Sequence, residues 1–372
     1  NSLSWDRRVT VVLPEGWAGA NDHAGNALCV QDAEGGNVIS ATVPAMGFAT
    51  IHRADAKPCD TAGGKCGVTV ETGLLENNLI RATFNASGEL TSVVDKATGR
   101  ETLAGLGNEM KLFKDVPTNF DAWDIDSMYE DQPVALDPSA KVEVLTSGML
   151  EGSLKISRTI NKSTLTQTVT LRRDSRRIEF DTVVEWAERH KLLKVGFDTN
   201  IHANEAIHEI QFGHVSRPNH RSRQYDFDRF EVANHKWTAL AEARRGAAVL
   251  NDSKYGVNVL GGVINLTLLR APVAPDDQAD LGTQKFTYAF FAWDGVDLAD
   301  SGLVREGYEL NVPLTVTAGA AGNASLLGVD AENVVIETVK PAEDGSGDII
   351  VRLYEAMRTA TQCTLSAGFG VS

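Results

Sequence analysis

The sequence has no excess of basic residues and no long apolar run, and each absence narrows the class of protein. It contains 35 Lys and Arg against 50 Asp and Glu, which gives a formal net charge of −15. This balance argues against a nucleic-acid partner, because a phosphate backbone needs a basic surface. No apolar run approaches the ~20 residues that span a bilayer, and the opening NSLSWDRRVTVVL lacks the regions of a signal peptide. We therefore expect a chain that binds neither nucleic acid nor membrane.

Cysteines and familiar catalytic motifs are also scarce. Cys29, Cys59, Cys66 and Cys363 form no CxxC pair and no dense framework, which fits a reducing compartment or the absence of a redox role. Cys59 and Cys66 could bridge a short loop if the chain were exported. The sequence has no GxSxG turn, no nucleotide-binding glycine-rich loop, no HExxH and no cysteine with a plausible histidine partner. The residues by themselves therefore supply no reaction.

The main pattern in the sequence is the alternation of apolar and polar residues, which is typical of β-strands. LTQTVTL (165–171) and RIEFDTVVEW (177–186) predict a hairpin, and LKVGFDTNI (193–201) predicts a third strand. LIRATF (79–84) and LTSVVD (90–95) predict another hairpin across the NASG turn. No amphipathic helix longer than two turns is evident. Further strands are predicted for AAVLND, GVINLTLLR, FTYAFFAW, LNVPLTV, NVVIETV and DIIVRLY.

These strands predict an all-β fold, in which a large multi-stranded antiparallel β-sandwich of mutarotase-like type is flanked by smaller β units. A hydrophobic content of 42% is ample for the core of such a fold. Changes in composition place small β-sandwich strands in residues 1–56, the large sandwich in 69–316 and a C-terminal β unit in 317–372.

The stretch NFDAWDIDSMY (119–129) concentrates acids and rings beyond the needs of a strand. On a strand, Asp124 and Asp126 would point to one face about 6.5 to 7 Å apart, with Trp123 on the other face. That spacing lies at the short end for the two carboxylates of an inverting glycosidase. An indole beside acids also suits sugar binding, whereas an exposed Asp-x-Asp on a strand edge is the more common explanation.

Two further stretches gather charged side chains. In residues 212–237, a polar loop whose Arg217 and Arg221 anchor carboxylates is favoured over a zinc site, because the spacing fits no trusted ligand pattern. In LLRAPVAPDDQADLG, Arg270 ends an apolar strand before an acidic loop, and this arrangement suits either gripping sugar hydroxyls or a salt-bridged loop. The zinc candidates are His214, His220, His235, Asp226 and Asp228, and the acidic loop contains Asp276, Asp277 and Asp280.

Taken together, these stretches resemble the C-terminal β region of the α-mannosidases of glycoside hydrolase family 38. The resemblance covers most of residues 1–293, and DAWDID indicates the cytosolic and vacuolar type. The matching segments, in family order, are NSLSWDR, LLENNLIRATFNASGELTSVVDKATGRE, GNEMKLFKDVPTNFDAWDID, IQFGHVSRPNHRS, FDRFEVANHKWTALAE, VLNDSKYGVNV and LLRAPVAPDDQADLG with FTYAFF.

The resemblance implies a zinc-dependent, retaining exo-α-mannosidase that hydrolyses terminal α-mannose from oligosaccharides. In this family the nucleophile, the acid/base and the zinc ligands come from an N-terminal α/β catalytic domain and the helical bundle after it. We therefore expect no catalytic residue and no metal ligand in this chain, which resembles a fragment with a truncated last sandwich and should be inactive alone. A cytoplasmic or vacuolar location follows from the subgroup, and a homo-oligomer is compatible with the sequence.

The motif match also implies roles for individual residues. Trp123, Asp124 and Arg270 would bind the sugar, and the residues expected at an interface or outer subsite are Asp121, Arg217, His220 and Asp280. Two other functions stay open. One is a stand-alone carbohydrate-binding β-sandwich, and the other is an independent hydrolase or sugar epimerase with a His and a carboxylate as acid and base.

Overall fold

The structure is a computed structural model, and it describes residues 1–55, 67–319 and 322–370 of the chain. Cys59 and Cys66, which could bridge a loop in an exported chain, lie outside these residues. Cys363 is exposed and carries a free thiol. The described residues form two compact units. The larger unit contains residues 67–210 and 215–307, and the smaller unit contains residues 1–55, 211–214, 308–319 and 322–370.

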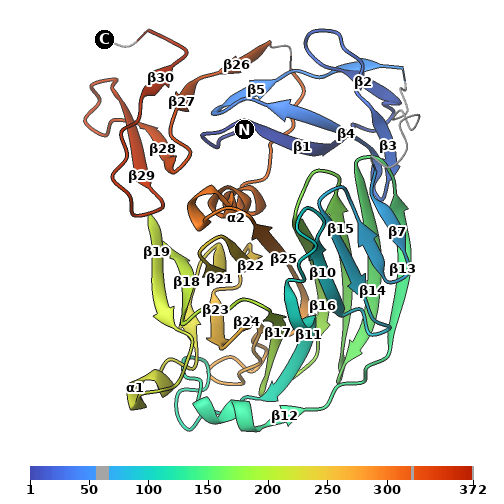
Figure 1. Ribbon diagram of the computed structural model, residues 1–372, viewed down its shortest axis with the longest axis vertical. Coiled ribbons are helices and arrows are strands. Elements are labelled where there is room, and N and C mark those ends of the chain that lie inside the picture. The colour runs from blue at the N-terminus through green and yellow to red at the C-terminus, as the bar shows by residue number, and fades with distance from the viewer. Residues whose placement is uncertain (56–66, 320–321, 371–372) are drawn as a thin grey trace. The chain divides into compact units, whose positions relative to one another are not determined.

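Two large antiparallel sheets form the core of the larger unit (Figure 1). The nine-stranded sheet has the order β13 (Ala140–Ser147), β14 (Glu151–Ile160), β15 (Ser163–Arg172), β16 (Arg177–Trp186), β25 (Gly282–Asp294), β22 (Arg245–Asn251), β21 (Trp237–Glu242), β18 (Glu205–Ile210) and β19 (Gly213–Pro218). The ten-stranded sheet has the order β20 (Val232–Ala233), β23 (Gly256–Leu260), β24 (Val263–Leu269), β17 (Lys191–Thr199), β11 (Leu103–Lys114), β10 (Leu90–Asp95), β9 (Ile80–Phe84), β8 (Leu74–Glu76) and β7 (Thr69–Glu71), and β12 (Pro133–Val134) pairs with β11.

Both predicted hairpins are confirmed. LTQTVTL and RIEFDTVVEW form β15 and β16, in which Leu165 pairs with Val184 and Leu171 with Ile178. LIRATF and LTSVVD form the antiparallel pair β9 and β10. LKVGFDTNI forms β17 but joins the ten-stranded sheet, so it does not extend the β15–β16 hairpin. The predicted all-β sandwich is thereby confirmed.

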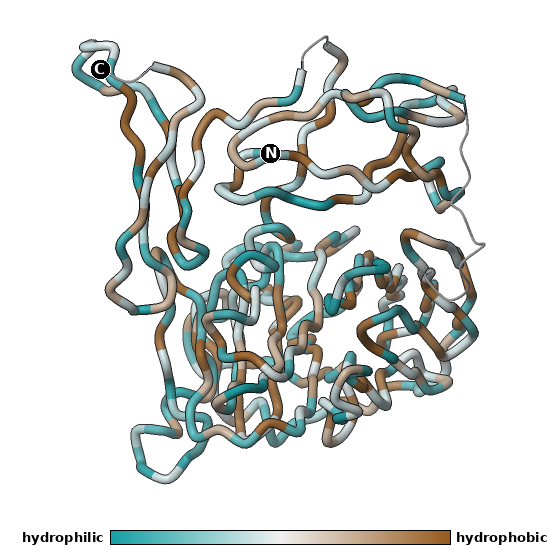
Figure 2. Tube along the Cα trace, turned by 45° about the horizontal axis from the view of Figure 1, so that its top comes forward, coloured by the Kyte–Doolittle hydropathy of each residue, from teal (hydrophilic) through white to brown (hydrophobic). Residues whose placement is uncertain are grey.

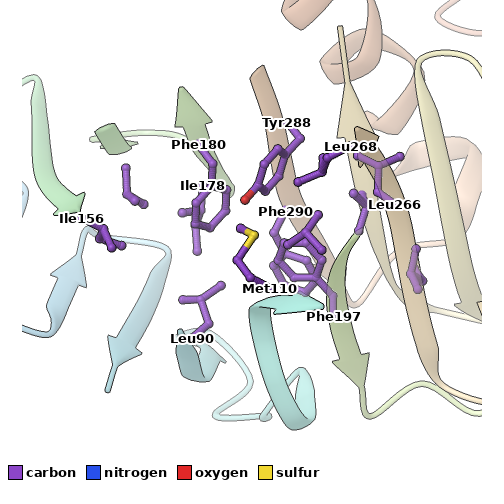
Figure 3. Packing of buried hydrophobic residues seen from close by; sticks show 14 of the residues in the cluster. Leu90, Met110, Ile156, Ile178, Phe180, Phe197, Leu266, Leu268, Tyr288 and Phe290 are labelled. Atoms are coloured by element: carbon purple, nitrogen blue, oxygen red, sulfur yellow. The ribbon is translucent and has the colours of Figure 1, made fainter. Parts of the chain in front are cut away.

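The core lies between the two sheets because each sheet turns one set of alternating residues inward. Figure 2 shows this alternation of apolar and polar residues along the strands. Figure 3 shows the aromatic centre, where Phe197 stacks on Phe290 with ring centroids 5.1 Å apart, and Phe180 stacks on Tyr288 at the same distance. All four rings are completely buried, so this cluster removes a large apolar area from water.

A small polar network crosses this apolar core. The Asn108 side chain on β11 donates to Gln167 Oε1 on β15 at 3.0 Å, and the Gln167 amide donates to Thr182 Oγ1 at 3.0 Å and to the Tyr288 hydroxyl at 2.6 Å. The Tyr288 hydroxyl in turn donates to Asn108 Oδ1 at 2.5 Å. The network explains how Gln167 can lie buried on the same face of β15 as Leu165, Val169 and Leu171, since every buried polar group needs a partner.

The smaller unit consists of short antiparallel pairs and one three-stranded sheet. That sheet has the order β1 (Arg7–Val12), β4 (Gly36–Val43) and β3 (Val30–Ala33). The pairs are β2 (Gly19–Asn21) with β6 (His52–Ala54), β5 (Gly47–Ala49) with β26 (Asn323–Ser325), β27 (Leu327–Val329) with β30 (Leu365–Ala367), and β28 (Val334–Pro341) with β29 (Ile349–Glu355).

Helices are few in the described residues, but one of them corrects the sequence analysis. The strand predicted for LNVPLTV is wrong, because residues 310 and 311 end the helix α2 (Leu303–Asn311), which also exceeds two turns. Arg7 donates to the carbonyls of Glu309 and Val312 at the end of this helix, and Pro313 cannot continue it. The other helices are η1 (Ser127–Asp131), α1 (Gln224–Phe227) and η2 (Leu298–Asp300).

The aromatic centre should dominate the stability of the larger unit. We expect Phe197→Ala to lower the free energy of unfolding by about 3–5 kcal/mol, because it leaves a cavity in a closely packed cluster. Val144→Ala on β13, where Val144 is 43% exposed, should change it by about 0.5 kcal/mol or less. Urea unfolding of both variants measures the difference, and equal losses would contradict the central position of Phe197.

Candidate functional site

The segment between β11 and η1 contains NFDAWDID and is a loop, so the strand predicted there is wrong. Phe120 has a left-handed φ of 48°, and its carbonyl accepts the amides of both Trp123 and Asp124, at 2.7 and 2.9 Å. This tight turn reverses the chain where an extended strand was expected. The carboxylate pair considered for a strand is absent too, because Asp126 Oδ2 accepts the Thr118 amide and hydroxyl, whereas Asp124 is exposed.

Arg270 holds this loop by its backbone. Arg270 follows β24, and its Nε donates to Asp115 Oδ2 at 2.6 Å, while its two terminal nitrogens donate to the carbonyls of Asp121, Ala122 and Asp124 at 3.2, 3.5 and 2.7 Å. Asp115 is only 2% exposed in its side chain, so the ion pair is shielded from water. A single guanidinium therefore fixes the start and the middle of the loop.

Asp121 fixes the same loop from the other direction. Its Oδ2 accepts the backbone amides of Val273 and Ala274 at 2.7 and 3.1 Å, and His190 Nε2 lies 3.2 Å away. Burial alone would raise the pKa of Asp121, but the hydrogen bonds from Val273 and His190 hold that pKa below its ordinary value. The loop and the residues after Arg270 are thus bound to each other in both directions.

The outward groups of this loop are an indole and a carboxylate. Trp123 is 72% exposed, and the Asp124 side chain is exposed beside it, while its own carbonyl is bound by Arg270. The backbone is fixed while these two side chains remain accessible to a ligand. A ring with a neighbouring hydrogen-bond acceptor is a combination that binds sugars, because the ring covers the apolar face of a pyranose.

The other predicted site residues lie in different surroundings. Asp280 stands before β25 in a left-handed conformation, φ 61°, and burial raises its pKa although Lys254 and Arg270 act to lower it. Arg217 donates to the Ala233 carbonyl at 3.0 Å. His220 Nδ1 is buried and 3.8 Å from Asp226, which also pairs with Arg223 and Arg229. None of these contacts joins them to the loop, apart from the effect of Arg270 on Asp280.

The zinc hypothesis for residues 212–237 finds no support in the geometry. Within the described ranges, no three side chains of His, Cys, Asp or Glu come together in a way that could hold a metal ion. The His214 ring bonds the Ala356 carbonyl at 3.0 Å. Asp226 pairs with Arg223 and Arg229. Of the two arginines expected to anchor carboxylates, Arg221 pairs with Glu130, whereas Arg217 donates to a backbone carbonyl.

Sequence reasoning missed Asp115 and His190, the partners of Arg270 and Asp121. Asp115 directly follows the long strand β11, and a buried carboxylate needs a cationic partner or hydrogen-bond donors. His190 follows β16 and carries a positive φ of 48°, for which the sequence gives no local signal.

Comparison with known proteins shows the family of the chain. The model of the glycosyl hydrolases family 38 C-terminal domain matches residues 75–278, and that of the family 38 C-terminal beta sandwich domain matches residues 333–372. Alpha-mannosidase 2C1 of Homo sapiens is 37% identical over 98% of this chain and 35% of its own length. Alpha-mannosidase G of Dictyostelium discoideum is 36% identical over 84% of this chain and 30% of its own length.

A solved structure shares the fold across nearly the whole chain. An alpha-mannosidase from Enterococcus faecalis V583 superposes with a TM-score of 0.79 at 16% identity, covering 98% of this chain and 51% of that one. The family model that matches residues 75–278 and the two relatives at 36% and 37% identity show that the chain belongs to glycosyl hydrolase family 38. Within that family it corresponds to the C-terminal domains of α-mannosidases, as the resemblance predicted, and it spans about a third of the length of the curated relatives named above.

The described residues include no helix that is both long and apolar enough to cross a bilayer.

The lowered pKa of Asp121 gives a testable pH dependence. A depressed folded-state pKa stabilises the fold above the unfolded pKa of about 3.9, and this contribution is lost as the pH falls through the folded value. Asp121→Asn should therefore cost roughly 1–2 kcal/mol near neutral pH, and the difference from the parent should shrink below about pH 4. Urea unfolding at several pH values measures it, with the exposed Asp277→Asn as the control. A loss of stability that is independent of pH would show that the charge of Asp121 does not contribute to the stability of the fold.

Proposed function

We propose that this chain is the C-terminal portion of a retaining, zinc-dependent exo-α-mannosidase that hydrolyses terminal α-mannose from oligosaccharides. In this proposal the chain completes the sugar pocket of an N-terminal α/β catalytic domain and its helical bundle. It contributes no nucleophile and no acid/base group. Family membership and the names of the relatives support the mannosidase reaction.

The observation that carries the proposal is the fixed loop with Trp123 and Asp124 exposed. Arg270 and Asp121 bind the backbone around these side chains, so a sugar would meet groups that are already positioned. The indole would cover one face of the mannose, and the Asp124 carboxylate would accept bonds from its hydroxyls. Arg270 would act chiefly by orienting this loop, and Asp121 would support it.

Zinc does not fit the residues that the structure describes, since no metal-ligating group of three forms among them. In the proposed enzyme the zinc ligands would belong to the catalytic domain, as the family resemblance implies, and the residues of this chain would bind and orient the sugar. Asp280, Arg217 and His220 would lie at an outer subsite or at the domain interface. We further propose a cytoplasmic or vacuolar location, in line with the subgroup that DAWDID indicates.

The test uses the enzyme that contains this chain together with its catalytic domain. Asp124→Ala should lower kcat/KM for an aryl α-mannoside roughly tenfold to a hundredfold, because the sugar loses a charged hydrogen-bond acceptor. Trp123→Ala should raise KM for the same substrate. Asp174→Ala, a partly exposed acid in the β15–β16 turn, serves as the matched control and should leave both constants unchanged.

Two outcomes would count against the proposal. Unchanged kinetics for both Asp124→Ala and Trp123→Ala would remove the loop from the sugar pocket. Mannose binding by this chain without the catalytic domain, measured by calorimetry and lost in Trp123→Ala, would favour a stand-alone carbohydrate-binding module.

A further inference from the structure

A fully buried lysine lies on the outer face of the ten-stranded sheet. Leu193, Val195 and Phe197 of β17 point into the core, so Lys194 points to the opposite face, yet its side chain is only 2% exposed. Its Nζ bonds Glu231 Oε2 at 2.5 Å and Thr267 Oγ1 at 2.8 Å. Burial lowers the pKa of Lys194, while Glu231 acts to raise it.

The cover over this lysine is η1, the short helix that follows the DAWDID loop. Tyr129 of η1 lies with its ring centroid 5.5 Å from Lys194 Nζ, and its hydroxyl donates to Glu231 Oε2 at 3.3 Å. The same ring packs edge-on against Phe113 at 5.2 Å. Glu130, the next residue, receives both terminal nitrogens of Arg221 at 2.6 Å. Thus η1 is bound to Lys194 of β17 and to Arg221 and Glu231, which all lie far from it in the sequence.

The neighbouring strands leave space for the Glu231 carboxylate and supply a hydrogen bond to it. A side chain at Gly256 would begin 3.1 Å from Glu231 Oε1 and 3.1 Å from Thr267 Cβ, so a glycine leaves the room that the carboxylate occupies. Thr267 lies directly opposite Lys194 on the neighbouring strand β24, and its hydroxyl donates to Glu231 Oε1 at 2.5 Å. Each oxygen of Glu231 is therefore bound, as a buried carboxylate requires.

We infer that Lys194 and Glu231 are positioning residues for the 115–131 segment, which contains the exposed Trp123 and Asp124. Arg270 and Asp121 fix the first half of this segment, and the Lys194–Glu231 pair fixes its second half through Tyr129. With both halves bound to the sheet, the loop between them keeps one conformation without a ligand. Only the sugar-binding role of the loop rests on the proposed function. Whether the segment is held in one conformation can be measured without any sugar.

The experiment is hydrogen exchange followed by mass spectrometry on the chain. The amides of Trp123, Asp124 and Tyr129 are hydrogen-bonded within the segment, so they report its opening. The variant is Lys194→Met with Glu231→Gln, which avoids leaving one buried charge unpaired. We expect exchange in residues 119–131 to become roughly tenfold faster or more, with residues 163–186 unchanged.

A matched control lies on the next strand. Lys111 faces Lys194 across β11 and β17, and its Nζ is 3.0 Å from Glu109. Lys111 also donates to Asn265, and among the described residues no hydrogen bond or ion pair of Lys111 or Glu109 involves η1. Lys111→Met with Glu109→Gln should therefore leave exchange in residues 119–131 at the parent rate. Tyr129→Phe, which removes only the phenol bond, should speed exchange there by a smaller factor.

Three results would overturn the inference. They are an unchanged rate in residues 119–131 of the Lys194/Glu231 variant, an equal acceleration in residues 163–186, and an equal effect of the Lys111/Glu109 control. If the Lys194/Glu231 variant does not fold, Tyr129→Phe decides, and an unchanged rate there refutes the role of η1. Failure of the mannosidase proposal appears separately, as kinetics that do not respond to Asp124→Ala.

Discussion

The two large sheets can bury their apolar faces only against each other, and the rest of the larger unit depends on this constraint. Because side chains alternate along each strand, the strands that turn Leu165, Phe180 and Phe197 inward must turn the neighbouring residues outward. Lys194 faces outward for that reason and must be covered and neutralised by something other than the core. The packing of the sheets also fixes the positions of residues that directly follow strands, such as Asp115 and Arg270. The loop that Arg270 binds is therefore attached to fixed positions.

At the loops, charged groups select one backbone conformation, which apolar packing alone cannot do. Dispersion and burial are not directional, whereas a guanidinium with several donors can select one arrangement of carbonyls. Arg270 bonds carbonyls along the loop, and Asp121 bonds amides after Arg270. The result is a rigid support under side chains that are themselves exposed. This division suits a surface that must meet a polar ligand without first folding around it.

Much of the fold could be predicted from the sequence, because a period of two over long segments has one simple cause. The strands β9, β10, β15 and β16 show it clearly. The same reasoning fails for the loop at 119–126, because Trp123 and Ile125 alternate with Asp124 and Asp126 as they would in a strand. The loop is held by distant contacts, those of Arg270 and those of Asp121 with Val273 and Ala274. The LNVPLTV error is similar: its first residues belong to a helix whose end is satisfied by Arg7. The site residues Trp123 and Asp124 came from a family resemblance, whereas Asp115, His190 and Lys194 depend on contacts that no local pattern records.

The polar network of Asn108, Gln167, Thr182 and Tyr288 gives the sandwich an alignment that its apolar contacts alone would not specify. Leucines and phenylalanines can slide against one another at modest cost, but sliding one sheet over the other would leave a buried amide and a phenol without partners. Asn108 belongs to one sheet and the other three residues belong to the opposite one. The network therefore favours one alignment of the two sheets over others. Because the loops begin at the ends of the strands, this alignment also sets where the loops lie.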